Sequence, residues 1–568
     1  MESNTSNSIC RCIVELLGRH GVRKAFVSPG SRNAPLLLAL SRSKEIDSEV
    51  VVDERSAAFM ALGYSLVSRE PVCLICTSGS ALLDYAPAIA EAYYRRVPLI
   101  VISADRPKHW IGQDDSQTIV QPGALSNVVK RSYDIGSNVT DDELWYANRV
   151  TNDALLTALT GRIGPVHLNV QLSEPLNGVE QIDREPFHVQ RTIDILKPKA
   201  ALEVSVARQL GCLIASPAKV MIVCGFLNPD KVLNKALARL SRLPNFVVLT
   251  ETVSNLHGDN FISSLYSTLA AIKGDDQSRF EPDYVISCGG ALISHHVKRL
   301  LRKTKLKGHW HVGELDDTVD CFRQLTMRIE MSPAIFFQQL ASAMQPHLEP
   351  CEYAGDWQIM KNRADSLTAS YVARIGWSDL KAFATFIPLI PRRWNVHFSN
   401  GTPIRYAQIF ANHQYHRCDC NRGVSGIDGC TSTAIGASLA YRNDVTLLIS
   451  GDTCAIYDIG ALAASVIPPR FKMIVIDNEG GGIFRFIGST SQLDIRERML
   501  CAPQKARVEA IAEAVGFKVF EADNEVSLRA SFRQFADESQ QPALLVVHTR
   551  GCDSASVLKE FFNFCKSN

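Results

Sequence analysis

The segment LISGDTCAIYDIGALAASVIPPRFKMIVIDNEGGGIF, residues 448–484, decides the fold that we expect for this chain. The apolar run Val445 to Ser450 predicts a strand that ends in a Gly-Asp turn, and helical spacing from Ala455 to Val466 predicts a helix. A second apolar run, Met473 to Ile476, ends in the glycine-rich turn DNEGGG. Strand, helix and strand in this order are typical of a parallel sheet. Both polar turns then lie at the carboxyl ends of strands, where α/β sheets bind ligands.

These two turns offer hard oxygen ligands. Asp452 supplies a carboxylate and Asn478 an amide oxygen, which suit an octahedral Mg²⁺ that in turn holds phosphates. Alone, the Gly-Asp pair favours an aspartate that caps a helix. The pair of turns resembles the diphosphate-binding motif of thiamine-diphosphate enzymes. The resemblance implies that Asp452, Asn478 and the Gly480 carbonyl bind Mg²⁺, or Mn²⁺ in its place, and that Gly451 and Thr453 contact the cofactor.

The bulk composition excludes several classes of protein. The 568 residues include 60 basic and 59 acidic side chains, so no excess charge favours nucleic acid. No apolar run approaches the ~18 residues of a membrane span, and the N-terminus lacks the pattern of a secretion signal. We therefore expect a cytoplasmic protein. The 16 cysteines are scattered through apolar runs, which favours reduced thiols over disulfides or zinc sites.

Strands alternate with helices in the N-terminal part as well. Strands are expected at Lys24 to Val27, Glu49 to Val52, Val72 to Cys76 and Leu99 to Ser103. A shift of 372 residues (450 − 78) lays Ser78-Gly79 on Ser450-Gly451 and Asp105 on Asp477 without a gap. This internal repeat predicts that the first and last domains share one architecture.

A third α/β domain is expected between these two. Its strand-like runs are Val220 to Cys224, Phe246 to Thr250, Tyr284 to Cys288 and His309 to Val312. Proline, glycine and mixed charge from Ser173 onward, and again from Met344 to Trp357, predict two linkers. The sequence thus predicts three doubly wound parallel-sheet domains of the α/β class, at residues 1–180, 190–345 and 360–568.

Thiamine chemistry needs two further groups. A carboxylic acid must reach N1′ of the aminopyrimidine, because that hydrogen bond favours the imino tautomer that deprotonates C2. Glu54, at a strand end, is our candidate, although an acidic residue there also fits a helix dipole. A bulky apolar side chain should hold the cofactor bent, and Ile427 fits this role.

Four arginines lie at turns on the expected ligand edge, namely Arg32, Arg106, Arg405 and Arg422. An arginine fork binds a carboxylate in bidentate fashion. A single such arginine is usually a surface or structural residue. Four on one edge indicate substrates with more than one negative charge.

Seven motifs carry a closer resemblance: SPGSRNAPL (28–36), DERSAAFMALG (53–63), TSGSA (77–81), ADRP (104–107), GPVHLNV (164–170), NRGVSGIDG (421–429) and DNEGGGIF (477–484). Together they resemble the 2-succinyl-5-enolpyruvyl-6-hydroxy-3-cyclohexene-1-carboxylate (SEPHCHC) synthase family of menaquinone biosynthesis. The resemblance implies a transferase that uses thiamine diphosphate to decarboxylate 2-oxoglutarate and adds the succinyl carbanion to isochorismate. It also implies that the first domain binds the aminopyrimidine and the last binds diphosphate and Mg²⁺.

The same resemblance implies substrate-binding roles and an assembly. Substrate carboxylates and hydroxyls would contact Ser31, Arg32, Arg106, Gln117, Arg405 and Arg422, and the isochorismate ring would pack against Ile483 and Phe484. Active sites would lie between subunits of a homodimer or homotetramer. The chain departs from the family pattern where a lysine is frequent after the middle-domain Gly-Gly, because the matching position falls near His295, with Lys298 one turn further on. Gly401 likewise stands where a small hydroxyl residue is usual.

Two other readings stay open from the residues alone. Another 2-oxoacid decarboxylase, or an enzyme like acetohydroxyacid synthase, would share the cofactor motifs but would not need several arginines for pyruvate. A catalytically silent thiamine-diphosphate-binding protein would be expected to lack the activating acid. Glu54 is present.

Overall fold

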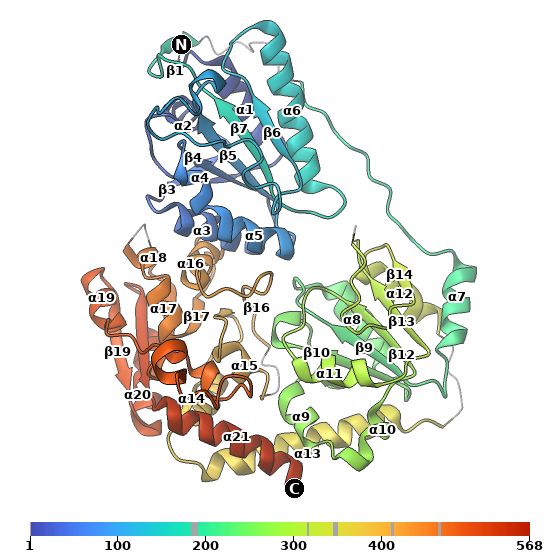
Figure 1. Ribbon diagram of the computed structural model, residues 1–568. Coiled ribbons are helices and arrows are strands. Elements are labelled where there is room, and N and C mark those ends of the chain that lie inside the picture. Colours follow the sequence, from blue (N-terminus) through green and yellow to red (C-terminus); the bar gives the residue numbers. More distant parts are fainter. Residues whose placement is uncertain (1, 183–190, 315–316, 345–349, 411–413, 464–466) are drawn as a thin grey trace. The chain divides into compact units, whose positions relative to one another are not determined.

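The computed structural model describes residues 2–182, 191–314, 317–344, 350–410, 414–463 and 467–568 (Figure 1). The chain forms two compact units. The first comprises Met1–Lys197, Gly423–Thr446 and Tyr457–Phe471, and the second comprises Pro198–Arg422, Leu447–Ile456 and Lys472–Asn568. Three six-stranded sheets with helices make up the fold, and every strand pairing described within them is parallel. The predicted α/β fold class is confirmed.

The first sheet has the order β3-β2-β4-β5-β7-β6. Its strands are β2 Lys24–Val27, β3 Asp47–Val50, β4 Val72–Cys76, β5 Leu99–Asp105, β6 Ser132–Ile135 and β7 Val166–Gln171, and its helices are α1 Ser8–Arg19, α2 Ala34–Ser41, α3 Glu54–Ser68, α4 Ser80–Asp84, α5 Ala86–Arg95, η1 Lys108–Trp110 and α6 Asp141–Leu159. Apolar side chains of α1, α2 and α6 pack on one face in a continuous core. Because the sheet is parallel, the turns after β2, β3, β4 and β5 share its carboxyl edge.

The predicted first linker is partly structured. Val179–Ile182 forms strand β8, which pairs antiparallel with β1, Glu2–Thr5. The composition of this stretch was a poor guide, because a two-stranded edge ribbon needs backbone partners more than apolar side chains.

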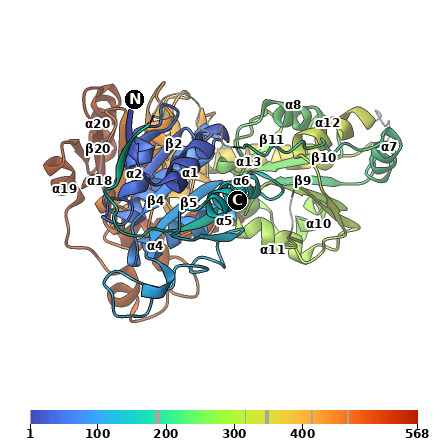
Figure 2. The ribbon, with the colours of Figure 1, turned by 90° about the horizontal axis from the view of Figure 1, so that it is seen from above.

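The middle sheet lies in the second unit, with the order β11-β10-β9-β12-β13-β14. Its strands are β9 Val220–Cys224, β10 Phe246–Thr250, β11 Phe261–Ile262, β12 Tyr284–Cys288, β13 Gly308–Val312 and β14 Met327–Ile329, and its helices are α7 Val204–Leu213, α8 Lys231–Leu240, η2 Thr252–Ser254, α9 Leu265–Ala271, η3 Gly274–Asp276, α10 Gln277–Phe280, α11 His295–Lys303 and α12 Pro333–Ala343. Figure 2 shows α8 and α12 on one face and α10 and α11 on the other. All four predicted strands of this domain are confirmed.

The second predicted linker ends in a helix instead. Helix α13, Tyr353–Arg374, begins inside it. Tyr353, Trp357, Met360 and Ala364 are buried along one face of this helix and join the core that covers the middle sheet. Apolar residues at this spacing form one helical face, which outweighs the neighbouring prolines and glycine in this stretch.

The third sheet has the order β16-β15-β17-β18-β20-β19. Its strands are β15 Asn395–Phe398, β16 Arg417–Asp419, β17 Thr446–Gly451, β18 Phe471–Asp477, β19 Lys518–Ala522 and β20 Ala543–His548, and the helices of this part are α14 Asp379–Phe386, η4 Ile387–Leu389, α15 Pro403–Ala407, α16 Cys430–Ala440, α17 Asp452–Tyr457, α18 Gly460–Ala463, η5 Gly482–Arg485, η6 Arg496–Cys501, α19 Val508–Ala514, α20 Glu525–Asp537 and α21 Gly551–Ser567. The two sheets have the same strand order: adding 13 to each strand label of the first sheet gives the order of the third, so that β3 corresponds to β16 (16 − 3 = 13). The shift of 372 residues carries β5 onto β18 end for end, which confirms the like architecture.

One helix predicted between β17 and β18 is broken in two. Helix α17 ends at Tyr457 and α18 begins at Gly460, while residues 464–466 lie outside the described part of the chain. Asp458, between them, is buried and accepts hydrogen bonds from the Ser432 backbone N–H at 2.7 Å and hydroxyl at 2.8 Å. The helical spacing of apolar residues from Ala455 to Val466 predicted one helix. That spacing carries no information about the hydrogen bonds that Asp458 makes with Ser432. None of the helices described here combines the length and apolar character that a membrane crossing requires.

Candidate active site

The turns after β17 and β18 meet at the carboxyl edge of the third sheet. Asp452 is the first residue of α17 and is buried. Its Oδ2 accepts a hydrogen bond from the Gly480 backbone N–H at 2.6 Å, and its Oδ1 accepts one from the Thr453 N–H at 2.5 Å. The structure therefore brings Asp452 and the Asn478–Gly480 turn together, as the parallel order of the strands requires.

The electrostatics of this edge favour a cation. Burial raises the pKa of the Asp452 carboxyl to about 6, and the neighbouring Asp477 carboxylate adds to the shift, while hydrogen bonds from Gly480 and Thr453 oppose it. A divalent ion would offset both the lost hydration and the repulsion between carboxylates. The donor set of carboxylate, amide oxygen and backbone carbonyl thus fits Mg²⁺.

Asp379 orients the Asn478 amide. The Asn478 Nδ2 donates to the Asp379 Oδ2 at 2.7 Å. This hydrogen bond fixes the orientation of the amide, so that its oxygen points away from Asp379. Asp379 is itself buried and accepts hydrogen bonds from the Thr549 hydroxyl at 2.6 Å and the Ser554 hydroxyl at 2.9 Å. Sequence reasoning missed Asp379, because Ser378-Asp379 reads as an ordinary helix start far from the motif.

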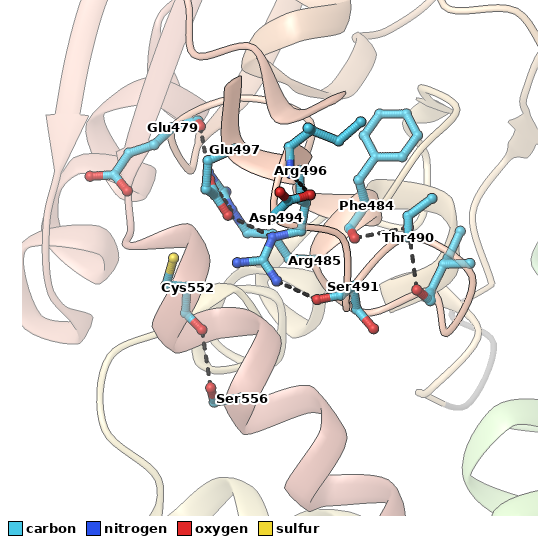
Figure 3. A network of polar contacts seen from close by, with 12 residues as sticks. Glu479, Phe484, Arg485, Thr490, Ser491, Asp494, Arg496, Glu497, Cys552 and Ser556 are labelled. Atoms are coloured by element: carbon cyan, nitrogen blue, oxygen red, sulfur yellow. Dashed lines mark hydrogen bonds and ion pairs between the residues drawn. The ribbon is translucent and has the colours of Figure 1, made fainter. Parts of the chain in front are cut away.

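Gly480 and Arg485 fix the glycine-rich turn. Gly480 has φ +107°, and a Cβ there would lie 2.3 Å from the Cys501 carbonyl oxygen, so only glycine fits. The Arg485 guanidinium donates to the Asn478 carbonyl at 2.7 Å and to the Glu479 carbonyl at 2.8 Å. Figure 3 shows this arginine beside Glu497, whose carboxylate accepts from it at 2.9 Å. Arg485 was also missed, although it directly follows the quoted motif.

Arg405 and Arg422 both belong to the second unit, and the Arg422 charge acts on the Arg405 guanidinium. Burial lowers the pKa of the Arg405 guanidinium, with the Arg422 charge contributing. Arg422 donates to the Asn400 Oδ1 at 3.0 Å, yet its Nε is buried and has no hydrogen-bond partner among the described residues. A buried cationic N–H without an acceptor is the group that an anionic ligand would satisfy.

A cavity of about 560 Å³ adjoins Arg405. Its wall includes Thr402, His295 and His296, and its apolar side comes from Phe486 and Ile487. The predicted ring-contacting residues Ile483 and Phe484 lie half-buried in the same segment, in η5, and are not among the residues that line this cavity. Lys298 donates to the Leu292 carbonyl at 2.9 Å, so the histidines and not this lysine border the cavity.

In the first unit, Glu54 is the first residue of α3 and is half-buried. Partial burial raises the pKa of its carboxyl, and the Asp84 and Asp53 charges contribute to the shift. Asp53 caps the helix, because its side chain accepts from the Arg55 N–H at 3.1 Å. The helix therefore does not depend on Glu54 for its N-terminal cap, and this carboxyl remains available for another role.

The other predicted residues of the first unit lie near its sheet edge. Arg32 is buried and pairs with Glu174 at 3.1 Å, and Arg106 pairs with Asp115 at 3.1 Å. Ser31 and Gln117 are exposed, and the Gln117 backbone lies against Gly79.

Ile427 is half-buried in the loop before α16. The buried Glu91 carboxylate holds the start of this loop by accepting from the Gly423 and Val424 N–H groups, both at 2.7 Å. Glu91 carries no sequence signal for this role, because its partners lie more than 300 residues away.

Comparisons with known proteins agree with this geometry. The family described as thiamine pyrophosphate enzyme, N-terminal TPP binding domain, matches residues 8–124, and the corresponding C-terminal TPP binding domain matches residues 402–547. The SEPHCHC synthase of Porphyromonas gingivalis is 39% identical over 560 residues, which cover 97% of this chain and 96% of that protein. The synthase of Flavobacterium johnsoniae is 33% identical over 564 residues, 98% of each chain. That of Christiangramia forsetii is 34% identical over 581 residues, 98% of this chain and 99% of that one.

These matches extend over nearly the whole chain and include both of its cofactor-binding domains. The chain is therefore a thiamine-pyrophosphate-dependent enzyme of menaquinone biosynthesis and belongs to the 2-succinyl-5-enolpyruvyl-6-hydroxy-3-cyclohexene-1-carboxylate synthase family.

Proposed function

We propose that this protein decarboxylates 2-oxoglutarate and adds the resulting succinyl carbanion to isochorismate by 1,4-addition, giving SEPHCHC and CO₂. Thiamine diphosphate, when bound, supplies the stabilisation of that carbanion. The observation that carries the proposal is the buried Asp452 carboxylate held against the Asn478–Gly480 turn, in a chain that matches named synthases over nearly its full length. Isochorismate and 2-oxoglutarate are both dicarboxylates, which agrees with the four arginines of the two units.

Different residues would bind the metal ion, the cofactor and the substrates. Asp452, Asn478 and the Gly480 carbonyl would hold Mg²⁺, with Gly451 and Thr453 beside the diphosphate. Glu54 would hold a proton at N1′ of the aminopyrimidine, and Ile427 would support the ring. Substrate carboxylates and hydroxyls would contact Ser31, Arg32, Arg106, Gln117, Arg405 and Arg422, and Ile483 and Phe484 would pack against the isochorismate ring. The domain assignment follows: residues 1–180 for the aminopyrimidine, 190–345 as the central domain, and 360–568 for the diphosphate and Mg²⁺.

A homodimer or homotetramer with active sites between subunits is part of the proposal. Four apolar side chains of the unit that contains Glu54 are exposed: Val50 at 59%, Val52 at 70%, Leu83 at 45% and Tyr94 at 49%. A subunit interface would cover such side chains. Light scattering during gel filtration should give at least twice the 62.7 kDa chain mass. We also propose that the protein works in the cytoplasm.

The direct test is an assay of the purified protein with thiamine diphosphate, Mg²⁺ and both substrates. We expect isochorismate absorbance to fall and CO₂ to appear in equal amounts. CO₂ release that is indifferent to isochorismate would instead identify a 2-oxoacid decarboxylase or an enzyme like acetohydroxyacid synthase with another acceptor. Tight cofactor binding without any CO₂ release would identify a silent binding protein.

Asp379→Asn should weaken Mg²⁺ binding by about 10- to 100-fold, the usual effect of removing a group that orients a metal ligand. The amide keeps the shape of the side chain, but it cannot accept three hydrogen bonds as the carboxylate does. Mg²⁺ titrations monitored by thiamine diphosphate binding measure the affinity. Ser554→Ala is the matched control, because it removes two hydrogen bonds of Asp379, one donated to its carboxylate and one accepted from its backbone N–H, and leaves the bond from Asn478 in place. An Asp379→Asn enzyme with unchanged Mg²⁺ affinity and a lower melting temperature would assign Asp379 to stability alone.

A further inference from the structure

The cavity beside Arg405 is strongly cationic. Its lining residues include Arg299, Arg405, Lys559 and Lys566, together with His295 and His296, and none of the described residues that line it is an aspartate or glutamate. The apolar part of the wall comes from α9, α21 and the segment after η5. A cavity with this lining fits a small organic anion that carries an apolar portion.

The two histidines lie side by side at the start of α11. Their ring centroids are 4.2 Å apart, and the Tyr266 ring lies 5.8 Å from His295 and 5.2 Å from His296. The fully buried Glu251 carboxylate fixes this helix start by accepting from the Ile293 N–H at 2.8 Å and the Ser294 N–H at 2.6 Å. The position of the histidine pair is thus set by a buried hydrogen-bonded support.

The His295 and His296 rings differ in their hydrogen-bond partners. The Arg299 guanidinium can only donate, so its 3.0 Å contact makes the His296 Nδ1 an acceptor and keeps that ring neutral. Burial, the His295 ring and the Arg299 and Lys566 charges lower the pKa of His296 to about 3. His295 has no such donor among its described hydrogen bonds, and its pKa is lowered by burial and by the Arg299, Arg405 and Lys298 charges. His295 is therefore the ring whose charge a ligand can change.

We propose that His295, with Arg405, recognises a substrate carboxylate and takes up a proton as the carboxylate binds. The groups that face His295 are Arg299 and Lys298 on its own helix, Tyr266 on α9, Arg405 on α15 and His296, with Lys566 of α21 facing His296. In the free enzyme these cations oppose protonation of His295. An incoming carboxylate neutralises part of that field and contributes a direct partner, so it raises the pKa of the ring.

The affinity for the carboxylate should increase as the pH falls. The reason is that the complex binds the proton more tightly than the free enzyme does. Between the lower pKa of the free ring and the higher pKa of the bound ring, the dissociation constant should rise by up to about tenfold per pH unit. A lysine at this position would carry its charge throughout and would show no such slope.

The test uses calorimetry of the full-length, cofactor-free protein, so that no turnover occurs. 2-Oxoglutarate and isochorismate are titrated separately at pH 7 in buffers of different ionisation enthalpy, which gives the protons taken up. We expect net uptake of up to about one proton with one of the two ligands. The ligand that shows it identifies which substrate His295 recognises.

His295→Lys should abolish this uptake and flatten the pH dependence of the dissociation constant while retaining binding. His295→Gln should abolish uptake and weaken binding. His296→Gln is the matched control, and it should keep the uptake because His296 stays neutral. Uptake that survives in His295→Lys, or that is absent from the wild-type protein with both ligands, would overturn the inference.

This inference rests on the proposed function only for the identity of the ligands. Different results would overturn the inference and the proposed function. If the enzyme binds both dicarboxylates but forms no SEPHCHC, the proposed reaction fails while the proton measurement still decides the role of His295. If SEPHCHC forms and the proton uptake does not depend on His295, only this inference is overturned.

Discussion

Replacing Glu54 with glutamine should leave thiamine diphosphate binding within a few-fold of wild type and lower kcat by about 10²- to 10⁴-fold, the range for loss of a general acid–base. Glutamine has the size of glutamate and can still accept or donate one hydrogen bond, but it cannot exchange a proton with N1′. Partial burial and the Asp84 and Asp53 charges raise the pKa of this carboxyl above its ordinary value, which is the direction that proton exchange near neutral pH requires. The effect should fall on kcat, because the carboxyl acts after the cofactor has bound.

Two measurements separate catalysis from folding for this variant. Cofactor binding is followed by calorimetry, and proton exchange at C2 of the bound cofactor is followed by NMR. We expect Glu54→Gln to slow that exchange in parallel with turnover. Asp53→Asn is the matched control, because asparagine also caps helices and the neighbouring charge is removed. Turnover by Glu54→Gln near that of the control would remove Glu54 from the mechanism.

The repeated architecture could be predicted because its signals are local. Apolar runs that end in Ser-Gly and Asp turns mark β4, β5, β17 and β18, and the 372-residue shift is visible without any structure. The right-handed connections of parallel strands restrict the possible strand orders, and the two sheets share one order. The pairing of Asp452 with the Asn478–Gly480 turn was accessible for the same reason.

The supports of the site could not be predicted, because their partners are distant in sequence. Asp379 reaches Asn478 across 99 residues and Glu91 reaches Gly423 across 332. No spacing rule covers such contacts, and each residue reads locally as an ordinary helix residue. Similarly, the sequence did not decide between His295 and Lys298. The structure separates them, because His295 lines the cavity and Lys298 donates to the Leu292 carbonyl.

These supports share a physical feature. Asp379, Glu91 and Glu251 are buried carboxylates that accept hydrogen bonds from N–H or hydroxyl groups of loops at the sheet edges. A buried carboxylate is costly unless several donors satisfy it, so each one strongly favours a single loop conformation. The enzyme can thus present rigid ligands from loops, which on their own would be mobile.

Replacing Asp452 with asparagine should abolish tight binding of Mg²⁺ and thiamine diphosphate and lower kcat/KM by more than about 10²-fold. One of the three proposed metal ligands loses its charge, and that charge is the main attraction for a divalent ion. The fold should tolerate the change. The carboxylate is already disfavoured by burial, as its raised pKa shows, and the amide can keep one of the two accepted backbone hydrogen bonds. One backbone N–H loses its acceptor, so we expect the free energy of unfolding of the cofactor-free protein to fall by no more than about 3 kcal/mol.

Thermal unfolding with and without cofactor distinguishes these effects. In the wild-type protein, saturating Mg²⁺ and thiamine diphosphate should raise the melting temperature, because a ligand that binds only the folded state stabilises it by mass action. Asp452→Asn should melt near the cofactor-free wild type and show no such rise, while Asp537→Asn, a change of an exposed aspartate at the end of α20, should keep the full rise. Removal of Mg²⁺ with EDTA should reproduce the Asp452→Asn result in the wild type. A full cofactor-dependent rise in Asp452→Asn would place the metal elsewhere, because a site built on this carboxylate cannot bind the ion tightly once its charge is gone.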